Sequence, residues 1–271
     1  MKVFTIDLDI CNGCYCCQVA CKDEHVANDW TPYAKPQPET GQFWIGIKEL
    51  VRGQVPKVKV TYLIQMCHHC DDAPCVSGCE AKAILKRDDG LVLINPEKCV
   101  GCQLCSDNCP HDAIFFNQGL NIAQKCTGCS HLLDNDENWE VPRCVDQCPT
   151  AAIQFGEEAD LQDFIKDAEL MNPEAGTKSR VYYKGLPRKF VGGTLYDPAE
   201  KEVIIGAECI LTDEESNESF TATTDNFGDF WFRGLKDDRI FSLTFKKDGK
   251  TKTLNDVSTD KDLSLGDIPL V

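Results

Sequence analysis

The spacing of hydrophobic and polar residues changes character along the chain near residue 180. Beyond that point, residues 207–211 and 241–245 carry apolar side chains at alternating positions, strictly so in the second segment. A period of two is typical of a strand with one buried face. We therefore expect an all-β sandwich of the seven-stranded type over residues 190–271, beginning near Gly192-Gly193. Its core is predicted to contain Phe230, Phe232, Phe241, Leu243 and Phe245.

A helical pattern precedes this domain. Leu161, Phe164, Ile165 and Ala168 recur at helical spacing, which predicts a helix over residues 159–170 that ends before Asn172-Pro173. The rest of residues 1–189 consists of short segments around cysteines, and we expect them to form one domain of small helices and β-hairpins. The fold class predicted for the whole chain is α+β.

Cysteines dominate the first domain. The chain has 18 of them, and all but Cys209 lie between Cys11 and Cys148. Most belong to a repeat with two residues between its first two cysteines and three residues before its last. The four repeats contain Cys11, Cys14, Cys17 and Cys21; Cys67, Cys70, Cys75 and Cys79; Cys99, Cys102, Cys105 and Cys109; and Cys126, Cys129, Cys144 and Cys148. Cys16 and Cys209 are left over.

This spacing is typical of [4Fe–4S] clusters. A cubane takes four thiolates, one for each iron, and three cysteines on a tight loop reach three of its corners. The fourth cysteine of a repeat, which we expect to open a helix, binds the other cluster of a pair in bacterial ferredoxins. Gly13, Gly101 and Gly128 each follow the first cysteine of a repeat by two residues and let the backbone approach the cluster. Four repeats therefore predict four clusters.

Zinc and disulfides are the alternatives. Two Cys-x2-Cys pairs make a four-thiolate zinc site, but zinc gives no reason for a third cysteine two residues on. Disulfides require an oxidising compartment. We expect Cys16 to be a free thiol beside a cluster and Cys209 to be a small buried hydrophobic residue. His68 and His69, inside a cysteine loop, are interpreted as packing or hydrogen-bonding residues.

The chain is acidic, with a formal charge of −16 and an isoelectric point near 4.7. This charge argues against nucleic acid or an anionic membrane as a partner, and it serves either solubility or docking on another protein. Lys98 and Lys125 each precede a predicted cluster ligand. We expect both side chains to be solvated; the alternative is that they moderate the negative charge of the clusters. No export signal and no apolar stretch of about 20 residues is visible, so we expect a cytoplasmic protein without membrane insertion.

Longer motifs accompany the cysteines. They include Gln65-Met66-Cys67-His68-His69-Cys70-Asp71-Asp72-Ala73-Pro74-Cys75 and residues 81–84, 88–92, 125–129, 148–153 and 180–187. Together these motifs resemble the four-cluster iron–sulfur subunits of the dimethyl sulfoxide reductase family of molybdenum or tungsten enzymes. Glu80 departs from the pattern, since that family usually has proline after the corresponding cysteine.

The resemblance implies which cysteines share a cluster, because the first and fourth repeats pair in that family, as do the second and third. Set A is then Cys11, Cys14, Cys17 and Cys148; set B is Cys126, Cys129, Cys144 and Cys21; set C is Cys67, Cys70, Cys75 and Cys109; and set D is Cys99, Cys102, Cys105 and Cys79. It also implies electron transfer to or from a larger partner subunit, in a heterodimer, that carries molybdenum on molybdopterin guanine dinucleotide. No catalytic residue is expected in this chain, because the chemistry belongs to the partner's cofactor.

The segment from Thr224 to Leu235 resembles the signature of a transthyretin-like or collagen-adhesin-B-like β-sandwich. Within it, Asp225 and Asn226 are interpreted as turn formers before Gly228. The appended domain and the missing membrane anchor favour a hydroxyl-transferring molybdenum enzyme as the complex. The alternatives are a respiratory reductase for arsenate, polysulfide, thiosulfate or tetrathionate, and a free-standing polyferredoxin.

Overall fold

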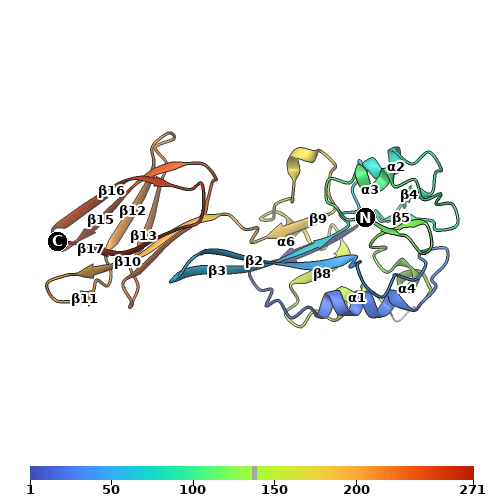
Figure 1. Cartoon of the computed structure of the whole chain (residues 1–271), viewed down its shortest axis with the longest axis horizontal. Coiled ribbons are helices and arrows are strands. Elements are labelled where there is room, and N and C mark those ends of the chain that lie inside the picture. Colours follow the sequence, from blue (N-terminus) through green and yellow to red (C-terminus); the bar gives the residue numbers. More distant parts are fainter. Residues whose placement is uncertain (136–138) are drawn as a thin grey trace. The chain divides into compact units, whose positions relative to one another are not determined.

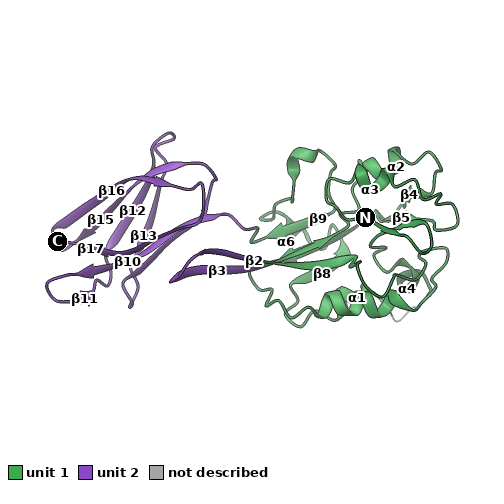
Figure 2. Cartoon of the chain, in the orientation of Figure 1, with its two compact units in different colours: residues 1–49, 62–186 green, residues 50–61, 187–271 purple. Residues whose placement is uncertain are grey.

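A computed structural model describes residues 1–135 and 139–271 (Figure 1). The chain divides into two compact units (Figure 2). Unit 1 consists of Met1–Glu49 and Tyr62–Leu186, and unit 2 consists of Leu50–Thr61 and Pro187–Val271. All sixteen cysteines of the four repeats lie in unit 1, whereas Cys209 lies in unit 2. No local pattern indicated that residues 50–61 associate with the C-terminal part of the chain.

A three-stranded sheet and short hairpins frame unit 1. In the sheet, β1 (Lys2–Asp7) lies between antiparallel β8 (Ile153–Glu157) and parallel β9 (Val181–Lys184). The two-stranded sheets are β2–β3 (Ile45–Gln54, Lys57–Met66), β4–β5 (Ile84–Lys86, Val92–Ile94) and β6–β7 (Phe115–Asn117, Ile122–Gln124). Four consecutive residues of β1, from Val3 to Ile6, are buried, as expected for a central strand covered on both faces.

Each cysteine repeat contains a helix. The helices are α1 (Cys16–Val26), α2 (Pro74–Ser77), α3 (Leu104–Asp107) and α5 (Arg143–Asp146), and α4 (Ser130–Asn135) follows Cys129. The third cysteine of each repeat lies inside the helix. The fourth comes just after a one-turn helix at Cys79, Cys109 and Cys148, where its N–H donates to a carbonyl of that turn. Among the described residues, no helix is both long and apolar enough to cross a membrane.

The prediction that the fourth cysteine opens a helix is therefore wrong. At Cys79, Cys109 and Cys148 the preceding helix has already ended, and Cys21 lies in the middle of the longer α1. In these three repeats the single helical turn forms around the third cysteine, and the N–H of the fourth cysteine closes that turn from outside the helix.

The helix predicted over residues 159–170 is also shorter than expected. α6 spans Gln162–Ile165, and a 3-10 turn, η1 (Pro173–Ala175), follows it. None of the side chains of α6 is buried. Because most helical stability in proteins comes from packing of an apolar face, periodicity without a partner surface sustains only a short helix. Phe164 instead lies beneath the Lys184 ammonium, whose nitrogen is 4.4 Å from the ring centre.

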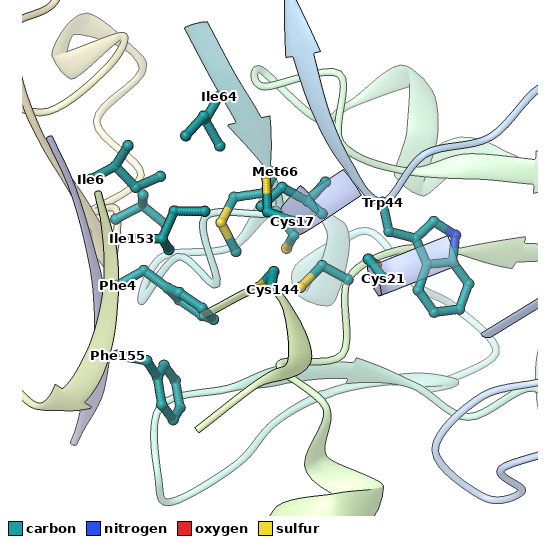
Figure 3. Close-up of a cluster of buried hydrophobic side chains, with 14 of the residues drawn as sticks. Phe4, Ile6, Cys17, Cys21, Trp44, Ile64, Met66, Cys144, Ile153 and Phe155 are labelled. Carbon is teal, nitrogen blue, oxygen red and sulfur yellow. The ribbon is translucent and has the colours of Figure 1, made fainter. Parts of the chain in front are cut away.

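The interior of unit 1 combines ordinary apolar residues with cysteines. Phe4, Ile6, Ile153 and Phe155 from the central sheet point toward the same space as Ile64 and Met66 from β3 (Figure 3). Cys17, Cys21 and Cys144 lie in this cluster and are each less than one-tenth exposed (Figure 3). The cysteine repeats are thus built into the core of unit 1 rather than added to its surface.

Two four-stranded sheets form the main body of unit 2. One contains β11 (Glu202–Val203), β10 (Lys189–Asp197), β14 (Asp229–Leu235) and β17 (Leu263–Pro269); the other contains β13 (Ser219–Thr223), β12 (Glu208–Asp213), β15 (Ile240–Lys247) and β16 (Lys250–Ser258). Residues 187–271, all of which are described, therefore hold eight strands rather than seven, because the two-residue β11 pairs with β10.

The core of unit 2 lies between these sheets. The five predicted core residues are all buried there, which confirms the prediction, and Cys209 is fully buried beside them. Gly192 and Gly193 do not mark the beginning of this unit, because β10 begins earlier, at Lys189. Both glycines lie within β10. A Cβ atom on Gly193 would come 3.0 Å from the Phe230 ring, so the absence of a side chain lets this ring pack closely against the strand.

The tip of the β2–β3 hairpin packs on this sandwich through charged contacts. Arg52 donates to Asp262 at 3.0 Å, and the same carboxylate accepts the Phe190 N–H at 3.1 Å. Lys57, 4% exposed, forms an ion pair with Asp229. Such contacts link positions more than a hundred residues apart, and for this reason no local pattern predicted them.

Candidate metal centres

Set C surrounds a cavity. Cys67, Cys70, Cys75 and Cys109 all line it. Apart from these thiols, the lining includes apolar residues such as Ala73, Val92 and Ile114. Three of the cysteines come from the second repeat and Cys109 comes from the third, as the resemblance implied for this set.

Set D lines a second cavity. Cys79, Cys99, Cys102 and Cys105 border it, together with Ile84, Ile94 and other apolar residues. Here three cysteines come from the third repeat, and Cys79 comes from the second. The two hairpins β4–β5 and β6–β7 contribute Ile84, Ile94 and Ala123 to the walls, which explains how these short strands position the cysteine loops.

The thiols of sets A and B influence one another electrostatically. Burial, reinforced by the nearby Cys148 and Cys11, raises the pKa of the Cys17 thiol to about 12. Burial also raises the pKa of Cys21 well above its ordinary value, and Cys126 and Cys129 add to this effect. The structure therefore brings Cys148 to the first repeat and Cys21 to the fourth.

The sets follow one another in a row. Cys17 of set A raises the pKa of Cys144 in set B, although burial is the largest cause of that shift. Cys67 of set C likewise adds to the burial that raises the pKa of Cys126 in set B to about 11. Sets C and D share one apolar cluster, which contains Cys75 and Cys105. Sets A and B are thus neighbours, as are sets B and C and sets C and D.

Exposure differs between the ends and the middle of this row. Cys14 in set A and Cys102 in set D are exposed, whereas every cysteine of set B is buried. In set C, three cysteines are buried and Cys109 is partly so. Sets A and D thus each include a solvent-exposed cysteine, whereas sets B and C are largely buried.

The donor sets fit iron–sulfur clusters. Thiolates are the ligands that such clusters take, four for each cubane, and each set supplies four sulfur atoms. Burial raises the pKa of Cys129 and Cys75 to about 12, so a free thiolate there is unfavourable until a metal offsets the lost hydration. Within residues 1–135 and 139–271, no group of three or more His, Cys, Asp or Glu side chains is arranged to hold a single metal ion.

The cysteine loops share one backbone feature. The second residue after the first cysteine has a positive φ in every repeat, at Gly13, His69, Gly101 and Gly128. His69, with φ 46°, occupies a conformation in which three repeats use glycine. Its Nδ1 accepts a 2.9 Å hydrogen bond from the Val92 N–H in the β4–β5 hairpin. This hydrogen bond offsets part of the conformational cost of a non-glycine residue with positive φ.

His68 also acts through hydrogen bonds. Its Nδ1 lies 3.0 Å from the Ser179 hydroxyl and its Nε2 lies 3.4 Å from the Tyr183 hydroxyl. Its ring stacks on His111 with 3.7 Å between centroids. Both His68 and His69 are buried, and the interpretation of these residues as packing and hydrogen-bonding groups is confirmed.

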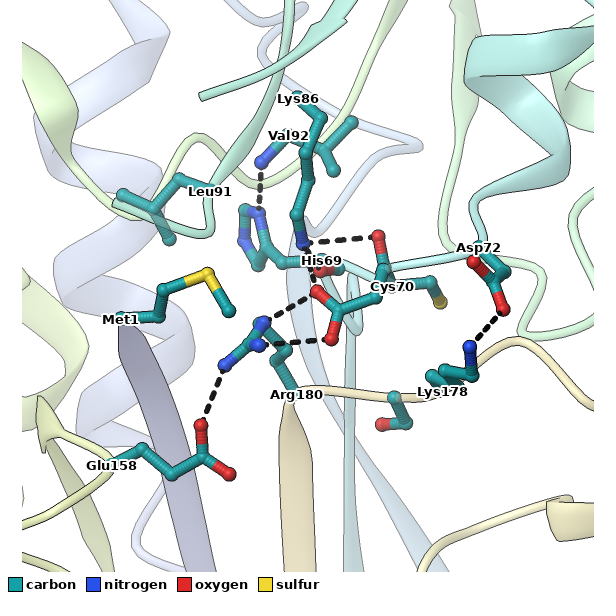
Figure 4. A network of polar contacts seen from close by, with 12 residues as sticks. Met1, His69, Cys70, Asp72, Lys86, Leu91, Val92, Glu158, Lys178 and Arg180 are labelled. Carbon is teal, nitrogen blue, oxygen red and sulfur yellow. Dashed lines mark hydrogen bonds and ion pairs between the residues drawn. The ribbon is translucent and has the colours of Figure 1, made fainter. Parts of the chain in front are cut away.

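An ion-pair network that the sequence did not reveal fixes the set C loop (Figure 4). Arg180 forms a bidentate pair with Asp71, at 2.6 and 2.8 Å, and its third nitrogen donates to Glu158 at 3.0 Å. Lys86 contacts the same Asp71 carboxylate at 2.7 Å and donates to the main-chain oxygens of His69 and Cys70. Because Arg180 is itself buried and directly precedes β9, these charge-assisted hydrogen bonds hold the Cys67–Cys75 loop beside the three-stranded sheet.

The remaining predictions concern isolated residues. Cys16 is exposed at the start of α1, whereas Cys209 is the buried hydrophobic residue that we expected. The Asp225 carboxylate accepts the N–H groups of Phe227 and Asp229, which confirms its role as a turn former. Lys98 is exposed, as expected for a solvated lysine, but Lys125 is buried. The prediction that Lys125 is solvated is therefore wrong.

Comparison with known proteins places this site in a class. A family model described as a 4Fe-4S dicluster domain matches residues 58–158. The small subunit of pyrogallol hydroxytransferase from Pelobacter acidigallici is 36% identical, over 98% of this chain and 97% of the relative. A subunit of tetrathionate reductase from Salmonella typhimurium is 35% identical over 69% of this chain and 73% of its own length. The iron–sulfur subunit of the arsenate respiratory reductase from a Shewanella species is 31% identical over 66% and 93%.

The fold and the cysteine sets thus define a 4Fe-4S iron–sulfur protein of the ferredoxin-like class, with a mostly β C-terminal region. The chain belongs to the family of electron-transfer iron–sulfur subunits of molybdenum enzymes. The three relatives named above are each described as a subunit.

Proposed function

We propose that this chain holds four [4Fe–4S] clusters, one on each of sets A to D, and conducts electrons along that row. The observation that carries the proposal is the row itself, with a donor set of four cysteines at each step and exposed cysteines at both ends. When bound, the clusters supply one-electron chemistry. The residues of this chain hold them apart from water, and Gly13, Gly101 and Gly128 shape the loops around them.

In fold terms, we propose a double ferredoxin-like module over residues 1–189. The pairing of the first repeat with the fourth and of the second with the third gives it two halves. Residues 190–271 are proposed to be a transthyretin-like or collagen-adhesin-B-like sandwich. Two sheets packed around one apolar core support this second assignment.

The partner is proposed to be a large catalytic subunit with molybdenum on molybdopterin guanine dinucleotide, in a cytoplasmic heterodimer. Among such enzymes we favour a pyrogallol–phloroglucinol transhydroxylase, which moves a hydroxyl group between polyhydroxybenzenes. Similarity to the Pelobacter small subunit over 98% of the chain supports this choice, since it must include the C-terminal unit. Because hydroxyl transfer involves no net redox change, the row would serve to bring the metal to its starting oxidation state.

A respiratory reductase of the tetrathionate or arsenate type is the second candidate. The relatives with those names are 35% and 31% identical but match only about two thirds of this chain. A free-standing polyferredoxin is the third, and the additional sandwich argues against it because a diffusible carrier needs no such domain.

Anaerobic purification of the intact complex tests these proposals. We expect a large molybdenum-containing subunit, together with about sixteen iron and sixteen sulfide per copy of this chain. The complex should convert pyrogallol to phloroglucinol and leave tetrathionate and arsenate unreduced. Iron near twelve would leave one set empty, and zinc with little sulfide would overturn the cluster assignment. Purification without a larger subunit would favour the free carrier.

A further inference from the structure

Three lysine or arginine side chains are buried among the described residues, and one of them lacks an acidic partner. Lys57 pairs with Asp229, and Arg180 pairs with Asp71 and Glu158. Lys125 is 2% exposed and takes part in none of the ion pairs between residues of the described ranges 1–135 and 139–271.

Main-chain oxygens hold the Lys125 ammonium. It donates a hydrogen bond to the Val92 carbonyl and another, of 2.9 Å, to the Cys126 carbonyl. Val92 lines the cavity of set C, and Cys126 belongs to set B. The ammonium therefore lies where these two sets adjoin, between the halves formed by the paired repeats.

The surroundings of this ammonium belong to both sets. Val92, whose carbonyl accepts its hydrogen bond, lines the same cavity as Cys75 and Cys109 of set C. Lys125 directly precedes Cys126 of set B in the chain. A single ammonium therefore lies beside two predicted clusters.

A buried cation needs negative charge nearby. Two carbonyl dipoles orient an ammonium but do not neutralise it, and an uncompensated charge in a protein interior is strongly unfavourable. An oxidised [4Fe–4S] cubane with four thiolates carries a net charge of about −2, and reduction makes it more negative. Clusters in sets B and C would supply the compensation that the polypeptide lacks at this point.

We propose that Lys125 is the counter-charge of the junction between sets B and C and raises the reduction potentials of both clusters there. The inference rests on the proposed function, since it requires clusters in these two sets. By favouring the reduced form on both sides of the junction, Lys125 keeps the step between the two halves of the row accessible to an electron.

The test replaces Lys125 by methionine, an unbranched side chain one atom shorter than lysine that carries no charge. Lys98→Met is a matched control, because Lys98 also precedes the first cysteine of a repeat but is exposed. Iron and sulfide analysis comes first, and an EPR-monitored redox titration of the anaerobic holoprotein follows. In Lys125→Met we expect two of the clusters to become harder to reduce by about tenfold, a shift of about 59 mV for a one-electron step. Lys98→Met should leave all potentials in place.

Unchanged potentials in a fully loaded Lys125→Met protein would overturn the inference, and so would an equal shift in Lys98→Met. Lys125→Gln and Lys125→Arg resolve the case in which the methionine variant loses iron. Glutamine can replace a hydrogen bond to a carbonyl but not the charge, whereas arginine keeps the charge. Retention of iron by the arginine variant alone would support the counter-charge, and loss of iron in all three variants would reduce Lys125 to a packing role. A wild-type protein without clusters would instead refute the proposed function.

Discussion

Gly101→Ala tests whether the set D loop depends on the shape of its backbone. Gly101 lies between Cys99 and Cys102 with φ +73°. A Cβ atom there would come 2.5 Å from the main-chain oxygen of Asn121 and 2.7 Å from its side-chain nitrogen. Asn121 itself has φ 55° in the β6–β7 turn, so its main chain has little freedom to move away. The same hairpin contributes the Ala123 N–H, which donates to the Cys99 sulfur at 3.4 Å.

The expected cost has two parts. An alanine in the left-handed region costs about 1–2 kcal/mol. Forcing a methyl group into a closely packed site costs about 1–3 kcal/mol more. Together they give about 2–5 kcal/mol, concentrated on the loop that carries three ligands of one cluster. We therefore expect the variant to lose the set D cluster, with iron falling by about four per chain, while the other clusters stay bound.

Gly176→Ala is the matched control. Gly176 has φ +64°, but a Cβ atom there would meet no other atom within 4 Å. The Gly176→Ala variant therefore has only the cost of an alanine with positive φ, without a steric clash, and we expect this protein to keep its full iron content. Anaerobic iron and sulfide analysis of both variants, with EPR to count the reduced clusters, measures the difference. Full iron in Gly101→Ala, or the same loss of iron in both variants, would refute this account of the loop.

Four further predictions concern the ligands and the C-terminal unit. Cys21→Ala should damage the cluster of set B, by loss or by conversion to a three-iron form, and EPR showing damage confined to set A would contradict the crossed pairing. Cys16→Ser should leave the iron content unchanged, and a lost cluster would make Cys16 a ligand. A chain that ends near Pro187 should keep its clusters but bind the large subunit more weakly in pull-down assays; full assembly and unchanged turnover would make the domain dispensable. In that truncated chain trypsin should cleave within residues 50–61, where intact protein resists, because Arg52 has lost Asp262.

Local spacing singled out the sixteen cysteines of the four repeats, and the family resemblance, rather than spacing, implied which of them line one cavity. Alternation predicted the sandwich core equally well, since Phe241, Leu243 and Phe245 need only face one way along a single strand. The failures arose where distant segments meet. Arg180 reaches Asp71 across more than a hundred residues, and the burial of Lys125 depends on Val92 in another hairpin. The helix over residues 159–170 was overestimated for the same reason, because no partner surface formed beside it.

The division of the β2–β3 hairpin between two units has a consequence for synthesis on the ribosome. The tip emerges early, but the strands on which it packs follow more than 120 residues later in the sequence. At about 5–20 residues per second, the tip waits on the order of ten seconds for its partner. During that time Arg52 and Lys57 lack their ion-pair partners Asp262 and Asp229, and the Phe190 ring that lies against Gly53 has not yet been made. The nascent chain thus passes through a stage at which the hairpin tip has no folded partner and is open to mispairing, and capture by a chaperone there would favour correct assembly.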